Sequence, residues 1–238
     1  MWLGARVVVV VPAWNEAPRV GRVVGSIPTW VDDVVVVDDA STDGTADAAR
    51  ASGDPRVRVE RHSTNRGVGA AIVTGYRSAL SAGGQPRDAL VVMAGDGQMD
   101  PLDLPALVTP IARGTADYVK GTRFRSPGVA RVMPPARLAA GLWLSWATGL
   151  AIGMAISDSQ CGYTAIARAA CARLDLGGLW PRYGYPNDLL SQVALRHLRI
   201  AEVPVRAIYA DEVSRLRPRH VPAVVALVVR AFLRRVLA

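Results

Sequence analysis

Residues 91–101 have the sequence VVMAGDGQMDP, in which a short apolar run changes abruptly into small and acidic residues. Such a run predicts a buried strand that carries its polar tip to the edge of a sheet. Three polar side chains alternate at this tip: Asp96, Gln98 and Asp100. In an α/β protein, carboxylates at a strand end are candidate ligands for a metal or for a metal-bound phosphate. A turn followed by a helix cap would account for the same residues. The rest of the chain is therefore needed to distinguish a ligand site from a turn.

Three further apolar runs end in polar clusters in the same way. Helical apolar spacing follows each of the four runs, and this alternation predicts an α/β fold with a mostly parallel central sheet and helices on both faces. Ligands bind such sheets at the carboxyl ends of the strands. The three other predicted strands and the clusters that follow them are 6–11 with Trp14-Asn15-Glu16, 34–37 with Asp38-Asp39, and 57–59 with Asn65-Arg66-Gly67. The sequence therefore predicts a ligand site where these strand ends meet.

Several classes of site are excluded by missing motifs. The chain has no Walker loop, no glycine-rich fingerprint after its first strand and no GxSxG elbow. Cys161 and Cys171 have neither metal-ligand spacing nor a disulfide framework, and the histidines, including His62, are expected to be surface or interface residues. Acidic groups beside a glutamine suit Mg²⁺ or Mn²⁺, which commonly bridges to substrate phosphates. A nucleoside diphosphate bound through a metal is the simplest ligand.

The net charge of +8 is concentrated in two segments. Residues 120–137 contain five basic residues and no acid, and residues 201–238 contain seven arginines against three acids. This asymmetry suggests a polyanionic partner: nucleic acid, an anionic membrane or a phosphorylated substrate. A nucleic-acid binder ranks low, because the basic segments contain no known reader motif.

Seven motifs, in order along nearly the whole chain, resemble those of family 2 glycosyltransferases with the GT-A fold. The likeness is greatest to the polyprenyl-phosphate, dolichol-phosphate mannose synthase-like branch. Any single motif is weak, whereas the ordered set is specific. The motifs are VVVPAWNE (9–16), VVVDDASTDGT (35–45), NRGVGAA (65–71), AGDGQMDP (94–101), KGTR (120–123), DSQCGYTAI (158–166) and AEVPVRAIYADEVSRL (201–216).

The resemblance implies a role for each matching residue. Pro12, Trp14 and Glu16 would line the base and ribose of a GDP- or UDP-hexose, and Asp39 would close the base pocket. Asp96 and Gln98 would bind Mg²⁺ or Mn²⁺. The full donor set is Pro12, Ala13, Trp14, Glu16, Val37, Asp39, Ala94, Gly95, Asp96 and Gln98, and the set facing the acceptor and its phosphate is Arg123, Asp158, Ser214 and Arg215. Asp158 could orient the acceptor or only close a turn.

Ala94 departs from the family pattern, which normally has an acid at this position. One carboxylate is therefore missing from the usual surroundings of the metal. Mg²⁺ keeps several waters and needs few protein carboxylates, so binding remains feasible but weaker. A catalytically inactive relative is the alternative.

The leading functional prediction is an inverting transferase, with Asp96 and Arg123 as catalytic residues, that moves a hexose to a polyprenyl phosphate. Its acceptor is already anionic and needs no general base. If the acceptor is instead a saccharide or small-molecule hydroxyl, a carboxylate base is required, and Asp188 in GYPNDLL (184–190) lies where hydroxyl-acceptor relatives carry one. Helix capping by Asp188 is the competing interpretation.

Two apolar segments in the second half of the chain predict contact with a membrane surface. Residues 138–157 carry no charge, but glycines dilute the segment, so an interfacial helix is favoured over a membrane span, with a helix in the core as the alternative. Residues 221–237 predict a second interfacial helix or an oligomer contact. We therefore expect a GT-A domain at 1–217, with a basic loop and interfacial helix at 120–157, and an amphipathic helix at 218–238. Without a recognisable secretory signal, the expected location is the inner face of the cytoplasmic membrane, bound peripherally.

Overall fold

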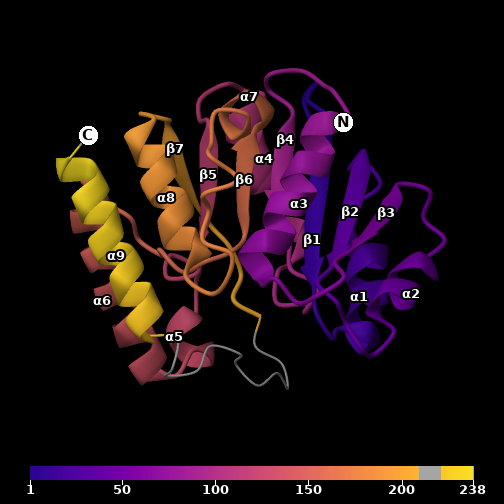
Figure 1. Ribbon diagram of the computed structural model, residues 1–238, viewed down its shortest axis with the longest axis horizontal. Coiled ribbons are helices and arrows are strands. Elements are labelled where there is room, and N and C mark those ends of the chain that lie inside the picture. Colours follow the sequence, from indigo (N-terminus) through magenta and orange to yellow (C-terminus); the bar gives the residue numbers. More distant parts are fainter. Residues whose placement is uncertain (209–220, 238) are drawn as a thin grey trace.

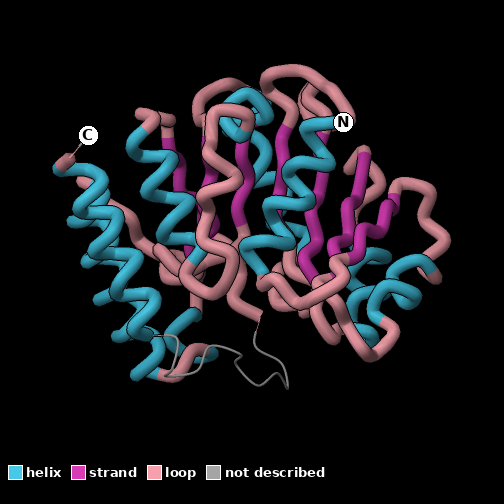
Figure 2. The backbone as a smooth tube through the Cα atoms, in the orientation of Figure 1, coloured by secondary structure: helices cyan, strands magenta, loops and turns pink. Residues whose placement is uncertain are grey.

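The computed structural model describes residues 1–208 and 221–237. Seven strands form one sheet, and helices pack on both of its faces (Figures 1 and 2). The strands are β1 (Val7–Ala13), β2 (Asp33–Asp38), β3 (Val57–Arg61), β4 (Ala89–Val92), β5 (Tyr118–Thr122), β6 (Thr164–Ala167) and β7 (Ile200–Pro204). The helices are α1 (Ala17–Ser26), α2 (Thr45–Arg50), α3 (Val68–Ser81), the 3₁₀ turn η1 (Pro101–Asp103), α4 (Leu104–Ala112), α5 (Val129–Val132), α6 (Pro135–Ile152), α7 (Arg168–Cys171), α8 (Tyr185–Leu195) and α9 (Val221–Val236).

The sheet has the order β3-β2-β1-β4-β6-β5-β7. Its centre is built from valine-rich runs that are buried on both faces, as expected for parallel strands covered by helices. Strand β6 is antiparallel to both of its neighbours, and every other pairing is parallel. The predicted mostly parallel α/β fold is therefore confirmed.

The direction of β6 determines what lies at the carboxyl edge of the sheet. Because β6 runs the opposite way, its beginning lies at the edge where β4 and β5 end. The segment 158–163, which leads into β6, is thereby brought beside the end of β5. Strands β5, β6 and β7 did not stand out in the sequence, because they are short and lack the long β-branched runs of β1 and β2.

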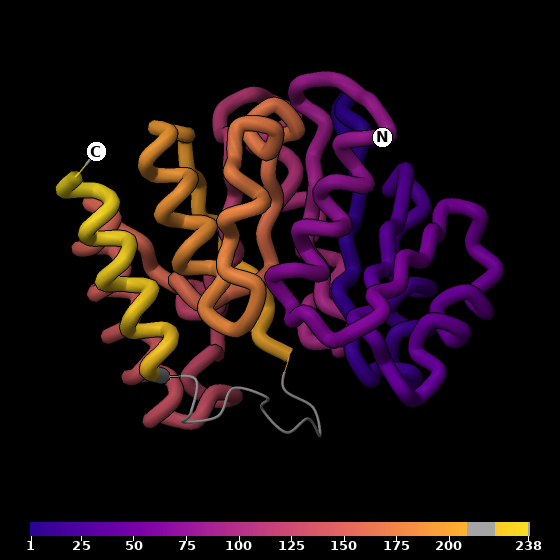
Figure 3. The backbone as a smooth tube through the Cα atoms, viewed as in Figure 1, coloured from indigo at the N-terminus to yellow at the C-terminus, as the bar shows by residue number. Residues whose placement is uncertain are grey.

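Helices α6 and α9 lie side by side at one end of the sheet, next to α8 (Figures 1 and 3). In the part of the chain that the structure describes, neither these nor any other helix combines the length and apolar character needed to cross a bilayer. The predicted domain boundary at residue 217 falls outside the described residues and stays a prediction.

Candidate active site

The loops after β1 and β2 are tied together by hydrogen bonds across the edge of the sheet. The Asn15 amide donates to Ser41 Oγ at 2.9 Å, and the Thr42 amide donates to Asn15 Oδ1 at 2.9 Å. Asn15 adopts a positive φ of 52°, which turns the chain sharply after the strand. These contacts leave the Trp14 side chain exposed beside the two loops.

The other donor residues predicted on β1 and β2 are buried. Ala13 and Val37 belong to the strands themselves, and their side chains are buried. A ligand could therefore contact mainly their backbone atoms. Glu16 is also buried, and its carboxylate accepts a 2.9 Å bond from Arg19. Contact between Glu16 and a ribose stays a prediction. Arg19, the hydrogen-bond partner of Glu16, does not belong to any of the seven motifs.

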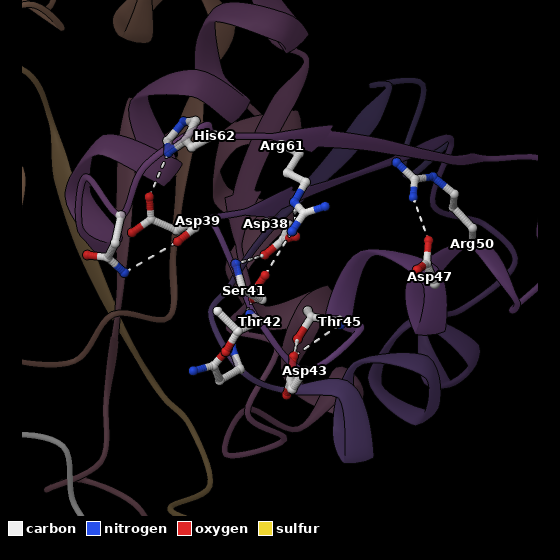
Figure 4. Close-up of polar contacts among 12 residues, drawn as sticks. Asp38, Asp39, Ser41, Thr42, Asp43, Thr45, Asp47, Arg50, Arg61 and His62 are labelled. Carbon is white, nitrogen blue, oxygen red and sulfur yellow. Dashed lines mark hydrogen bonds and ion pairs between the residues drawn. The ribbon is translucent and has the colours of Figure 1, made fainter.

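Asp39 is the most firmly held carboxylate at the end of β2 (Figure 4). Its Oδ1 accepts from the Arg66 amide at 2.8 Å, and its Oδ2 accepts from the Gly67 amide at 2.7 Å. His62 Nδ1 lies 2.7 Å from Oδ1. His62 is buried here, so its expected position at the surface is wrong. No local motif marks this residue, because its partners Asp39, just after β2, and Thr74, in α3, are distant in sequence.

The loop after β4 brings Asp96 and Gln98 to the same edge of the sheet. The Gln98 amide donates to Asp96 Oδ1 at 3.0 Å, so the two side chains belong to one tight turn. Asp100 serves another purpose, because it caps the Leu102 amide at 2.9 Å and pairs with Arg206 at 2.9 Å. Within the described residues no three His, Cys, Asp or Glu side chains gather as a ready-made metal site.

The oxygen donors at this tip nevertheless fit a hard divalent cation. Asp96 offers a carboxylate and Gln98 an amide oxygen, which are ligand types that Mg²⁺ and Mn²⁺ prefer. With alanine at position 94, the chain supplies few protein ligands there. A cation at this tip would therefore need oxygens from a bound diphosphate and from water.

Arg123 is fixed at the end of β5 by Asp158. The Nε of Arg123 donates to Asp158 Oδ2 at 2.8 Å, its NH2 group donates to Oδ1 at 3.0 Å, and its backbone amide donates to Oδ2 at 3.1 Å. Asp158 Oδ1 also accepts from the Cys161 amide at 3.1 Å, which is the predicted turn closure. Because Asp158 is fully buried, its direct effect is to orient Arg123.

The charges around Asp158 favour its ionised form. Burial by itself raises the pKa of the Asp158 carboxyl, but the hydrogen bonds and charge of Arg123, together with the charge of Lys120, outweigh it and lower the pKa. Lys120 is wholly buried behind this pair and donates to the Cys161 carbonyl at 2.6 Å. Burial lowers the pKa of the Lys120 ammonium. The KGTR motif contains both cations, but the sequence predicted a role only for Arg123.

Asp188 lies inside the first turn of α8 and does not cap the helix, which begins at Tyr185. The capping interpretation is therefore wrong. Asp188 is 2% exposed, and it accepts from the Trp180 amide at 2.8 Å, from Arg230 at 2.8 Å and from Arg234 at 2.7 Å. Both arginines belong to α9, so this carboxylate fastens the last helix to α8. The carboxylate of Asp188 already accepts hydrogen bonds from three donor groups. Its role as a general base stays a prediction.

A family model described as glycosyl transferase family 2 matches residues 8–170, which include the four strand ends and the Arg123–Asp158 pair. The chain belongs to glycosyl transferase family 2. Its seven-stranded sheet is the GT-A fold, and the protein is a glycosyltransferase.

Curated relatives cover most of this family 2 enzyme. It is 36% identical over 211 residues to an undecaprenyl-phosphate mannosyltransferase of Micrococcus luteus, covering 84% of this chain and 82% of the relative. It is 30% identical over 206 residues to a polyprenol monophosphomannose synthase of Mycolicibacterium smegmatis, covering 84% and 76%. A dolichyl-phosphate N-acetylglucosaminyltransferase of Methanococcus voltae that uses UDP-N-acetylglucosamine is 29% identical over 217 residues, covering 85% of each chain.

Solved structures with the same fold include glucosyl-3-phosphoglycerate synthase from Mycobacterium tuberculosis. Its complex with Mn²⁺, UDP and phosphoglyceric acid superimposes with a TM-score of 0.71 at 25% identity, covering 98% of this chain and 78% of that one. A second complex of the same synthase holds Mg²⁺ and UDP, with a TM-score of 0.66. These neighbours bind a divalent cation together with a nucleoside diphosphate.

Two acceptor-side residues expected from the motifs, Ser214 and Arg215, lie outside the described residues. The described chain resumes at α9, whose arginines reach Asp188. Of the residues expected to face the acceptor, Arg123 and Asp158 are therefore described, and an ion pair joins them at the end of β5.

Asp188→Ala is expected to lower the free energy of unfolding by about 2–4 kcal/mol. The substitution removes a buried partner from Arg230 and Arg234 and leaves the Trp180 amide without its acceptor. Urea unfolding monitored by circular dichroism measures the loss. Asp47→Ala is the matched control, since Asp47 forms an exposed ion pair with Arg50, and it should change stability by no more than about 0.5 kcal/mol. Equal stability of the two variants would contradict the fastening role.

Proposed function

We propose that this family 2 enzyme transfers a hexose, with inversion, from a nucleoside-diphosphate sugar to a polyprenyl phosphate at the cytosolic face of a membrane. The observation that carries the proposal is the composition of the sheet edge. A carboxylate–amide turn ends β4, an arginine fixed by a buried carboxylate ends β5, and an exposed apolar face formed by α6 and α9 lies at the same end of the molecule as β5 and β7. Relatives named for undecaprenyl phosphate, polyprenol and dolichyl phosphate support the choice of acceptor.

The reaction requires stabilisation of the departing nucleoside diphosphate. The bond from the anomeric carbon to the diphosphate oxygen breaks, and a bond from the same carbon to an oxygen of the lipid phosphate forms on the opposite face. A divalent cation held by Asp96 and Gln98 would supply Lewis-acid stabilisation of the diphosphate. Arg123 would neutralise part of the charge that develops on the leaving group. Because Asp158 holds the guanidinium in place, little reorganisation is needed during transfer.

A phosphate acceptor also fits the lack of a free carboxylate base at Asp188. A lipid phosphate is already anionic near neutral pH, so its oxygen attacks without losing a proton. A hydroxyl acceptor needs a base that reaches its proton. Both carboxylate oxygens of Asp188 accept from α9 arginines, and one accepts from the Trp180 amide as well. This occupation favours the phosphate acceptor over the hydroxyl.

The α6–α9 face, defined by Leu142, Trp143, Trp146 and Leu150 of α6 and Val225, Val229, Phe232, Leu233 and Val236 of α9, is apolar and exposed. Helix α6 is inverted relative to an ordinary surface helix, because Ser145 and Thr148 are buried while Trp143 and Trp146 are each 61% exposed. The alternative of a helix in the core is therefore wrong. An apolar face with tryptophans, on a basic protein, is typical of a helix that lies in a membrane interface.

Hydrogen bonds and ion pairs join the helices of this face to each other and to α8. Arg235 of α9 donates to the Leu150 carbonyl of α6 at 2.9 Å, and Arg230 and Arg234 bind Asp188 of α8. We propose that the α6–α9 face docks on the bilayer that contains the acceptor lipid, with the protein bound peripherally.

Replacing Trp143 and Trp146 together by serine is expected to weaken binding to vesicles of phosphatidylglycerol and phosphatidylcholine at least tenfold. Each indole would otherwise leave water on docking, which is worth about 1.5–3 kcal/mol for a large apolar side chain. Cosedimentation with the vesicles measures the loss. Leu3→Ser, which replaces an exposed apolar side chain outside the α6–α9 face, should bind as the unsubstituted protein does. Unchanged binding by the tryptophan double variant would show that another surface meets the membrane.

The proposed function is tested by supplying undecaprenyl phosphate with a panel of GDP- and UDP-hexoses, with and without a chelator. We expect a glycosylated lipid phosphate that requires Mn²⁺ or Mg²⁺ and is abolished by EDTA. Transfer only to soluble hydroxyl acceptors, lost in Asp188→Ala, would refute the lipid-phosphate acceptor. Tight nucleic-acid binding with a steep salt dependence and no nucleoside-diphosphate binding would refute the enzyme itself.

A further inference from the structure

His62 is buried between the end of β2 and the middle of α3, although it belongs to neither element (Figure 4). It follows β3 directly, and its backbone amide donates to the Asp38 carbonyl at 2.9 Å. Its Nδ1 lies 2.7 Å from Asp39 Oδ1, and its Nε2 lies 2.9 Å from Thr74 Oγ1. The imidazole thus bridges two elements through both ring nitrogens.

The carboxylate of Asp39 determines which tautomer the bridge uses. An ionised carboxylate only accepts, so His62 Nδ1 must carry a proton. In the neutral ring Nε2 is then an acceptor, and the Thr74 hydroxyl donates to it. Both polar ends of a buried ring are satisfied in this arrangement, as burial requires.

The contacts of Asp39 leave little acceptor capacity for a ligand. A carboxylate has about four lone-pair sites. Oδ1 uses two of them, for His62 and the Arg66 amide, and Oδ2 uses one, for the Gly67 amide. One site on Oδ2 remains. A single acceptor site matches one ring N–H, which uracil and guanine carry and which cytosine lacks.

We propose that His62 is a positioning residue for the nucleotide donor. It holds the Asp39 carboxylate so that its one remaining acceptor site meets the ring N–H of the donor base. This inference rests on the proposed function, because it takes Asp39 as the base-pocket carboxylate. His62 has no part in the transfer step itself, so its loss should change donor binding and leave the chemistry intact.

The asparagine and glutamine variants separate the two contacts of the ring. An asparagine amide can replace the Nδ1 donor to Asp39 but does not reach Thr74. A glutamine amide can replace the Nε2 contact to Thr74 but places no donor at the Nδ1 position. A merely structural bridge would be preserved about equally by either variant, whereas a positioning role requires the donor to Asp39.

The test is calorimetric binding of UDP, GDP and CDP in the presence of Mn²⁺, together with steady-state kinetics at varied donor concentration. For the unsubstituted protein we expect UDP or GDP to bind at least tenfold more tightly than CDP. His62→Ala and His62→Gln should raise the Kd of the preferred diphosphate and the donor KM about tenfold, with kcat within twofold. His62→Asn should stay within about threefold of the unsubstituted protein.

The opposite results would overturn the inference. His62→Asn as weak as His62→Ala, a loss of kcat at unchanged donor KM, or unchanged Kd in His62→Ala would each exclude a positioning role. Melting temperatures of the three variants control for a general loss of structure. If the unsubstituted protein bound no nucleoside diphosphate, the proposed function and this inference would both fail, whereas normal binding with an insensitive His62→Ala refutes only the inference.

Discussion

Asp96→Asn is expected to lower the rate of sugar transfer at least 100-fold and to leave the fold intact. Asp96 supplies the carboxylate at the β4 tip, and Ala94 provides no second acid to compensate. An asparagine keeps the volume and an acceptor for the Gln98 amide but removes the negative charge that attracts a divalent cation. Initial rates with saturating donor and acceptor, measured over a range of Mn²⁺ concentrations, give the loss.

Asp100→Asn is the matched control for this prediction. Asp100 lies on the same loop, but its oxygens cap η1 and pair with Arg206. The control variant should keep its transfer rate within a few-fold and its dependence on Mn²⁺ unchanged. Full activity of Asp96→Asn, or an equal loss in both variants, would contradict the placement of the metal at Asp96 and Gln98.

Arg123→Met is expected to reduce kcat by about 10²–10³-fold, the range found when one preorganised charge-stabilising group is removed. Arg123 is the cation that the described structure fixes at the end of β5, and methionine keeps much of its length without the charge. Donor KM should change less than kcat, because the guanidinium acts mainly on charge that develops during transfer. Steady-state kinetics with varied donor separates the two parameters.

Two further variants guard against a simple loss of folding. Arg123→Met leaves Asp158 buried without its partner, so stability falls as well. Arg123→Lys keeps a positive charge but loses the bidentate hydrogen bond to Asp158. Its kcat should lie between that of the unsubstituted protein and that of Arg123→Met. Arg125→Met changes an exposed arginine on the same loop and should have normal kcat. A folded Arg123→Met with normal kcat would refute the role of Arg123.

Much of the fold was predictable because its signals are local. Valine-rich runs of strand length, each followed by helical spacing, mark β1, β2 and β4 and the helices after them. A buried parallel strand needs apolar residues on both faces, so its own sequence identifies it. The polar residues after each run then had to share one edge, since parallel strands end on the same side. The shared edge and the seven motifs therefore predicted that Asp39 and Asp96 lie at one site before any contact was known.

The contacts of these residues depended on tertiary structure. The antiparallel direction of β6 brings Asp158 to Arg123, which is 35 residues away in sequence. Asp188 looked like a helix cap or a base, but its partners are arginines of α9 more than 40 residues later. His62 gave no signal, because its partners are Asp39, on the loop after β2, and Thr74, on α3. Pairings of this kind leave no periodic pattern in the sequence.

Helix α6 shows most clearly which features follow from the sequence and which depend on tertiary structure. Twenty uncharged residues at 138–157 predicted a helix near a membrane surface, but an uncharged sequence does not define which face packs inward. Neighbouring α8 and α9 and the loop at Ser159 cover Ser145 and Thr148, and they leave Trp143 and Trp146 exposed. The sequence by itself determined that these apolar residues exist at helical spacing and that four polar strand ends meet at one edge. Only the tertiary structure decided which side chains are covered, because burial depends on neighbours that are distant in the chain.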